Sequence, residues 1–272
     1  MRVPPCLAPV VLVVVFLLTP AFSPKLRATD YGPKWDLTPY FWQRDPKANF
    51  EDEGRMHCAP TSISDGLIYL SKVFHWKDLV PGADHDSQMA LIVDLAEKFH
   101  TDPSIGGTNP DRILTGLQTY VKDKGYSFKR LEVMTWRGLS ESNKSCKLGT
   151  KPSMEWMREA ASSKDTVMAF NFGWYKSGDD GYTRTGGHWV DAVGVEEGKN
   201  EFWIRNPIIP AKDQSEKWSV TLTKIEDFSV LKGNEEANMK GYFTGKGDGL
   251  PHSKNIEAVL DAVIVFSLEK KE

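Results

Sequence analysis

The hydrophobic pattern of this chain changes period near its middle, and that change limits the folds open to it. Up to about residue 125, apolar residues recur every three or four positions, as they do along one face of a helix. Further along, runs rich in β-branched and aromatic residues indicate strands. Because helices come mainly first and strands later, the pattern predicts an α+β fold with an antiparallel sheet, not alternating βαβ units.

Individual elements follow from the same pattern. Helices are expected to begin near residues 60, 84 and 109, and a weaker one to cover 151–163. The first has an apolar stripe formed by Ile63, Leu67, Leu70 and Phe74. Strands are expected over 126–135, 166–175, 187–195, 200–206, 217–223 and 257–268. Two Gly-rich segments, 178–181 and 245–249, are expected to be turns between strands.

The first 23 residues have the pattern of a signal peptide. Arg2 precedes an unbroken apolar run from Val10 to Leu18, which is too short to span a bilayer, and Ala21 and Ser23 suit a cleavage site. An uncleaved N-terminal anchor is the alternative. We expect an exported protein, secreted or periplasmic, with no membrane association after cleavage. The domain order is then a signal peptide (1–23), an extended Pro-rich arm (24–50) and a single domain (51–272).

Composition excludes several classes of function. The 272 residues contain 34 Lys plus Arg and 37 Asp plus Glu, a net charge of −3, so no basic surplus favours nucleic acid. Three cysteines are too few for a disulfide-dense scaffold or a Cys₄ zinc site. The histidines have no ligand partners at a fixed spacing, and we expect neither a metal nor a cofactor. Signal cleavage would remove Cys6 and leave Cys58 and Cys146.

The sharpest local motif is Cys58 at the start of the first strong helix. The positive end of a helix dipole favours a thiolate there, and the unpaired backbone N–H groups can bind an oxyanion. The alternative is a disulfide with Cys146, because an exported chain with two cysteines can oxidise them.

The second motif is His188, which opens a hydrophobic strand behind Gly186 and Gly187. The next expected strand ends at Asn206. Two adjacent antiparallel strands would bring His188 close to Asn206, whose amide can accept from the imidazole and direct its other nitrogen toward a thiol. A lone histidine at a strand end is more often structural.

Taken in order, these motifs resemble the papain-like cysteine peptidases, and within them the C39-like bacterial group. The motifs are Cys58-Ala59-Pro60-Thr61, Gly187-His188-Trp189-Val190 and Asn206-Pro207. The resemblance implies that residues 51–272 form a papain-like domain, with an N-terminal helical lobe and a C-terminal antiparallel sheet lobe. It also implies that Cys58 is the nucleophile, His188 the general base and acid, and Asn206 the orienting residue. The reaction would be hydrolysis of an amide bond in a peptide or protein through a thioester.

The chain departs from that group at two places. Ala59 stands where the group has glycine, and Asp52 and Glu53 stand where it has the glutamine that donates to the oxyanion. Gln43, in the arm, is our candidate for the missing amide; a buried, protonated Glu53 is the alternative. Two other functions stay open: a cell-wall amidase or endopeptidase of related fold, and a catalytically weak binding module that keeps the fold.

Overall fold

A computed structural model describes residues 32–179, 181–210, 214–250 and 255–271. The expected signal peptide and the first part of the arm lie outside the described residues. In the rest of the arm, Gly32–Leu37 form a short helix, α1, where we expected extended chain. The following segment packs against the body, because the Gln43 N–H donates to the Pro207 carbonyl at 2.8 Å.

The helices expected from the sequence are present, and side-chain caps fix where several of them begin. The Asn109 side chain accepts from the Arg112 N–H at 2.9 Å, and Asp84 accepts from the Ser87 N–H at 3.0 Å. The α-helices are α1, α2 (Cys58–Phe74), α3 (His85–Lys98), α4 (Pro110–Asp123) and α5 (Met154–Ser162), and 3₁₀ helices are η2 (Glu51–Gly54), η3 (Pro103–Ile105) and η4 (Glu141–Cys146).

The strands expected from the sequence are also present, together with four that the pattern missed. The expected strands are β1 (Tyr126–Thr135), β3 (Val167–Gly178), β4 (Gly181–Val195), β5 (Glu201–Arg205), β6 (Trp218–Lys224) and β10 (Ile256–Lys270). The additional ones are β2 (Lys147–Gly149), β7 (Val230–Lys232), β8 (Glu236–Asn238) and β9 (Phe243–Lys246).

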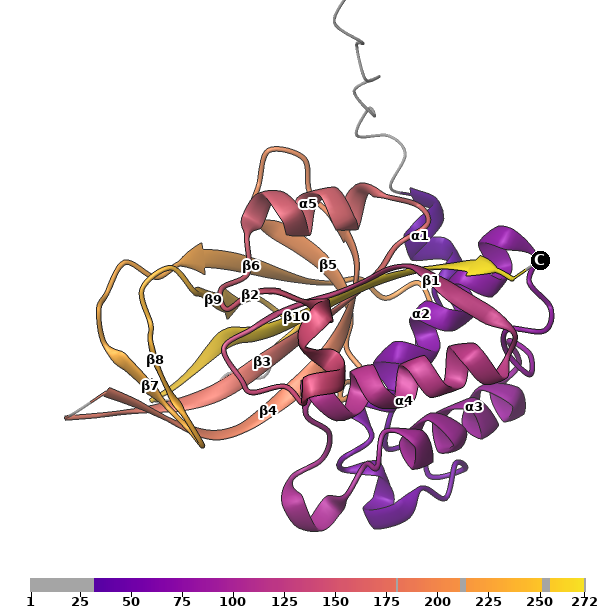
Figure 1. Ribbon diagram of the computed structural model, residues 1–272, viewed down its shortest axis with the longest axis horizontal. Helices are drawn as coiled ribbons and strands as arrows, with labels where there is room; N and C mark the ends of the chain where they lie inside the picture. Colours follow the sequence, from indigo (N-terminus) through magenta and orange to yellow (C-terminus); the bar gives the residue numbers. More distant parts are fainter. Residues whose placement is uncertain (1–31, 180, 211–213, 251–254, 272) are drawn as a thin grey trace, which may run out of the picture.

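Six strands close into an antiparallel barrel in the order β10, β3, β4, β5, β6, β9 and back to β10. Strand β1 extends the sheet from β10, and the β7–β8 hairpin is attached to β4 (Figure 1). The expected papain-like arrangement of a helical lobe beside an antiparallel sheet lobe is therefore wrong: the sheet is a closed barrel with extra strands.

The short strand β9 explains why the sequence pattern did not predict the closed barrel. We interpreted Gly245 and Lys246 as part of a turn, but they pair with β6 and complete the barrel. A Cβ atom on Gly245 would lie 2.5 Å from Cε1 of Phe172, so the glycine allows the strand to approach the aromatic interior. Glycine content, which signals a turn in the sequence, here marks close packing.

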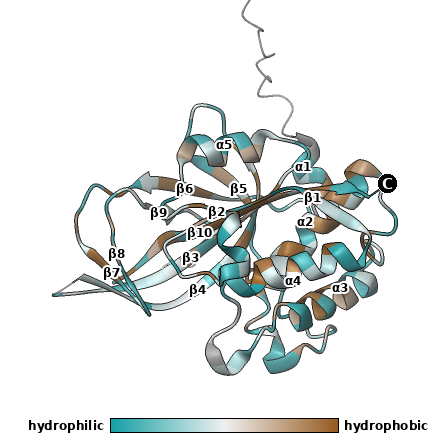
Figure 2. Cartoon of the chain, viewed as in Figure 1, coloured by the Kyte–Doolittle hydropathy of each residue, from teal (hydrophilic) through white to brown (hydrophobic). Residues whose placement is uncertain are grey.

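The two largest hydrophobic clusters of the described residues hold most of the elements together. One fills the barrel with alternate residues of its strands, such as Phe170, Phe172 and Val190, and includes Met157 of α5. The other joins α2, α3 and α4 to the outer face of the sheet. Hydrophobic and hydrophilic colours accordingly alternate along α3 and α4 (Figure 2). No helix in the described part of the chain is both long and apolar enough to cross a membrane.

Candidate active site

The turn before α2 determines the position of Cys58. Gly54 has φ +71°, and a Cβ atom there would lie 1.8 Å from the Gln43 carbonyl oxygen, so the position requires glycine. The Gln43 side-chain amide donates to the carbonyls of Gly54 and Arg55, both at 2.9 Å. His57 stacks on Phe50 with ring centroids 4.8 Å apart. These contacts hold the chain so that Cys58 is the first residue of the helix.

The helix is also fixed against β4, the strand that contains His188. The Ser62 hydroxyl donates to the Trp189 carbonyl at 3.2 Å. Burial raises the pKa of Cys58, while the backbone N–H groups of Trp189, Ala59 and Cys58 donate toward its sulfur and lower it. Burial dominates, so the resting group is a thiol at neutral pH, surrounded by donors that favour negative charge once it forms.

His188 and Asn206 are brought together as the sequence predicted. Strands β4 and β5 pair antiparallel, with Asp191 opposite Arg205. Just past this pair, Nε2 of His188 lies 2.6 Å from Oδ1 of Asn206. The amide oxygen also accepts from the Ile208 N–H at 3.1 Å, and the amide nitrogen donates to the Gly249 carbonyl. Because an amide oxygen only accepts, Nε2 carries the hydrogen and Nδ1 is the basic atom.

Burial also sets the protonation state of the imidazole. It lowers the pKa of His188 to about 4, against the opposing effect of the hydrogen bond to Asn206. His188 is therefore neutral at physiological pH and able to accept a proton. Trp174 of β3 stacks beside it, with ring centroids 6.5 Å apart and planes 13° from parallel. This tryptophan also lines the pocket and limits the orientations open to the ring.

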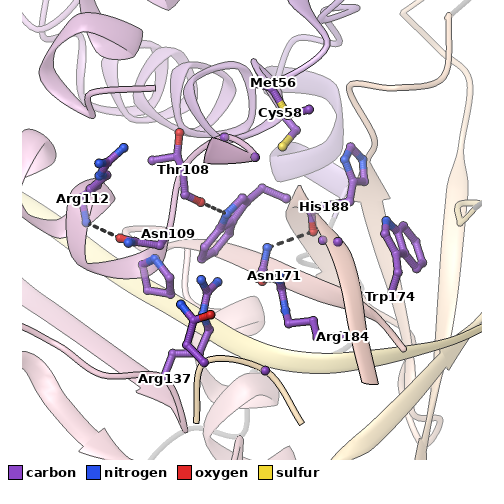
Figure 3. Close-up of a pocket in the computed structure, with 18 of the residues that line it drawn as sticks. Met56, Cys58, Thr108, Asn109, Arg112, Arg137, Asn171, Trp174, Arg184 and His188 are labelled. Carbon is purple, nitrogen blue, oxygen red and sulfur yellow. Dashed lines mark hydrogen bonds between the residues drawn. The ribbon is translucent and has the colours of Figure 1, made fainter. Parts of the chain in front are cut away.

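Cys58 and His188 line the same pocket, which has a volume of about 730 Å³. Figure 3 shows them beside each other at one end of it, with Asn171 and Arg184 farther along. Among the described residues, no hydrogen bond joins the Cys58 thiol to the His188 ring. A loose thiol–imidazole contact is common in sites without substrate.

Gln43 is occupied elsewhere. Both hydrogens of its amide are used by the Gly54 and Arg55 carbonyls, and Gln43 is not part of the pocket wall. Glu53 is also unsuited to the role of a buried acid, because its side chain is 74% exposed and pairs with Arg44 at 3.1 Å. The donors nearest to the Cys58 sulfur are instead backbone N–H groups.

The two described cysteines are both free, so the alternative of a Cys58–Cys146 disulfide is not realised. Cys146 is half-buried at the end of η4 and packs beside the cluster beneath α2–α4. Within the described ranges there is also no group of three or more His, Cys, Asp or Glu side chains placed to bind a metal ion.

Sequence reasoning missed the charged end of the pocket. Arg137 and Arg184 line it, and Arg184 forms a 2.9 Å ion pair with Asp261. The lone aspartate within the apolar run of β10 was a usable signal, because a buried carboxylate requires a partner. Nothing in the sequence indicated which arginine would supply that partner. The chain as a whole matches no protein-family model and no curated protein.

Proposed function

We propose that this protein is a cysteine hydrolase that cleaves an amide bond, with Cys58 as nucleophile, His188 as base and acid, and Asn206 as the orienting residue. The observation that carries the proposal is the 2.6 Å contact between His188 and Asn206, which fixes the ring tautomer inside the pocket that Cys58 also lines. A nucleophile, a base and a group that orients the base form the minimum set for this chemistry.

The reaction starts from a neutral pair. As the Cys58 sulfur attacks the substrate carbonyl, its proton passes to Nδ1 of His188, which then protonates the leaving amine. The acyl group stays on sulfur as a thioester. Water, deprotonated by the same imidazole, attacks the thioester and releases the acid. Asn206 stabilises the imidazolium by accepting its Nε2–H throughout.

The negative oxygen of each tetrahedral intermediate needs donors. The backbone N–H groups of Trp189, Ala59 and Cys58 all donate toward the sulfur, and those of Cys58 and Ala59 belong to the first turn of α2. They act together with the positive end of the helix. Gln43, our candidate for the glutamine amide of similar enzymes, supports the preceding turn instead.

We further propose a peptide or protein substrate met outside the cytoplasm, on the basis of the N-terminal apolar segment. A second candidate, a binding module with weak activity, is favoured by one observation: the side-chain amide that would complete the oxyanion site is occupied. The two differ in turnover and not in shape, so kinetics separates them.

A broad peptide library, with cleavage detected by mass spectrometry, tests the hydrolase proposal. We expect wild-type protein to cleave a subset of peptides, Cys58→Ala none, and Cys146→Ala the same subset as wild type. Cys146→Ala is the matched control because it removes the other free thiol of the described residues. Equal activity in wild type and Cys58→Ala would contradict the proposal, and folded wild type that cleaves nothing would favour the binding module.

A further inference from the structure

The pocket is chemically different at its two ends. Cys58 and His188 lie at one end and Arg137 at the other, with Asn171 between them (Figure 3). Among the described residues, the pocket is lined by four arginines and by a single carboxylate, Glu235; the arginines are Arg55, Arg112, Arg137 and Arg184. A pocket with this balance attracts anions, and the partners of each arginine show which one is available to a ligand.

Three of the arginines are already engaged. Arg184 donates to Asp261 at 2.9 Å and to the side chain of Asn171 at 3.3 Å. Gly187 makes room for it, since a Cβ atom there would lie 2.2 Å from its guanidinium. Arg112 donates to the His100 carbonyl at 2.8 Å. Arg55 is largely exposed and lies 4.0 Å from Asp52.

Arg137 is different from the other three. Its side chain is half-buried, and its guanidinium forms no ion pair or hydrogen bond with any residue in the described part of the chain; only its backbone does. Burial and the neighbouring charge of Arg184 lower the pKa of Arg137, while the charges of Asp261 and Glu235 act in the opposite direction. Glu235 is exposed at the rim and does not pair with it. The half-buried guanidinium thus faces the pocket beside a second cation, and no carboxylate of the described residues pairs with it directly.

We propose that Arg137 binds a carboxylate of the substrate, at the end of the pocket away from Cys58, and so selects amides with an acidic group near the scissile bond. Calling the ligand a substrate rests on the hydrolase function proposed above. The anion site itself does not depend on turnover. A guanidinium can bind a carboxylate through two parallel hydrogen bonds, which fixes both distance and orientation. The carboxylate can belong to an acidic side chain or to a peptide C-terminus.

Alkylating probes test the site without requiring hydrolysis. The probes are iodoacetylated dipeptides in two matched pairs. The first pair compares a glutamyl with a glutaminyl side chain, and both members have an amidated C-terminus. The second pair compares a free with an amidated C-terminus, and both members have the neutral glutaminyl side chain. The rate of Cys58 alkylation is followed by mass spectrometry. We expect the acidic member of at least one pair to react about tenfold faster than its neutral twin. The pair that shows the difference identifies the source of the carboxylate.

Variants assign the difference to one residue. Arg137→Gln should bring the acid-to-neutral ratio to about one, and Arg137→Lys should keep part of it, because the charge remains while the two-pronged geometry is lost. Arg55→Gln, which removes an exposed arginine of the same pocket, should leave the ratio as in wild type. If Arg137→Gln does not fold, the wild-type ratio and the Arg137→Lys value still decide the matter.

Equal alkylation rates within both pairs in wild type would overturn the proposal, as would a ratio that Arg137→Gln leaves unchanged. If the acid-to-neutral ratio stays high in a protein that hydrolyses no peptide, the anion site is supported and only the hydrolase proposal fails. The two proposals therefore have distinguishable failures.

Discussion

Strand β4 carries two buried ionisable groups three residues apart, and their surroundings differ. His188 has a neutral partner, Asn206, and burial lowers its pKa to about 4. Asp191 lies near two cations, Lys34 and Arg205; burial raises its pKa to about 7, and burial lowers that of Lys34 to about 8. The same desolvation thus leaves a neutral imidazole in the pocket and, three residues further along the strand, a carboxylate that ionises less readily.

The two cations near Asp191 hold the N-terminal arm against the body. The Arg205 guanidinium donates to the Trp35 and Thr38 carbonyls, at 3.0 and 3.2 Å, and lies 3.9 Å from the centre of the Trp35 ring. Lys34 donates to the Ser163 carbonyl at 3.3 Å. The buried ionisable groups in and around this strand therefore differ in what they do. The cations near Asp191 fasten the arm to the body, whereas His188, with its neutral amide partner, stays uncharged in the pocket.

Removing the nucleophile should have the largest effect. Cys58→Ala is expected to lower turnover by at least about 10⁴-fold, because no other thiol lines the pocket in the described structure. Its unfolding free energy should change by less than about 1 kcal/mol, since the exchange removes only a small side chain at a helix start. Chemical denaturation and peptide kinetics check this together; a large loss of stability with residual turnover would contradict it.

Acidification should destabilise the pocket through His188. The pKa of this group is lower in the folded state than its ordinary 6.5, so unfolded chains bind the proton first as pH falls. Its contribution, about 3 kcal/mol, is present above pH 6.5 and is lost progressively between 6.5 and about 4.

The difference between wild type and His188→Gln, measured by urea denaturation across this range, isolates that contribution. Asp191 has a raised pKa and acts with the opposite sign, so the wild-type curve alone mixes the two groups. Parallel pH profiles for wild type and variant would show that the imidazole is not held neutral.

Loss of the orienting amide should reduce turnover less than loss of the nucleophile. Asn206→Ala removes the partner of Nε2 but leaves the imidazole as a base, so we expect a decrease on the order of 10²-fold. Asn206→Asp is the informative companion, since a carboxylate would raise the pKa of His188. An unchanged rate in Asn206→Ala would show that other contacts, such as Trp174, orient the ring.

The smallest effect concerns the arm. Lys34→Met removes a cation near Asp191, which must then stay protonated to remain buried. Keeping it protonated costs more as pH rises, so we expect a stability loss of about 2 kcal/mol at pH 8 and less at pH 6. Turnover by the folded protein should stay as in wild type. A loss of turnover without a loss of stability would place the arm in the reaction.

The sequence predicted the local elements better than their closure into a fold. Amphipathic spacing fixed α2, and alternation with β-prone residues fixed β4 and β5, which was sufficient to place His188 beside Asn206. Barrel closure depends on the four-residue β9, whose glycine-rich sequence signals a turn. A strand so short has little pattern of its own, and only its tertiary contact with Phe172 explains it.

The remaining parts of the site were not predictable for a related reason. Gln43 could be identified as the nearest upstream amide, but the acceptors that occupy it are backbone carbonyls of Gly54 and Arg55, which no sequence pattern specifies. Arg137 comes just after β1, with no motif around it. Its place in the pocket results from the packing of β1 against β10, a contact between distant parts of the chain.

The central claim is that Cys58 and His188 act as a nucleophile and its base. The most direct test is acylation by p-nitrophenyl acetate, with intact-mass and peptide mapping to locate the acetyl group. We predict a thioester on Cys58 that forms at least about 10²-fold more slowly in His188→Ala, and no acetyl group on Cys146. Equal acylation of Cys58 in wild type and His188→Ala, or acylation of Cys146 in its place, would contradict the claim.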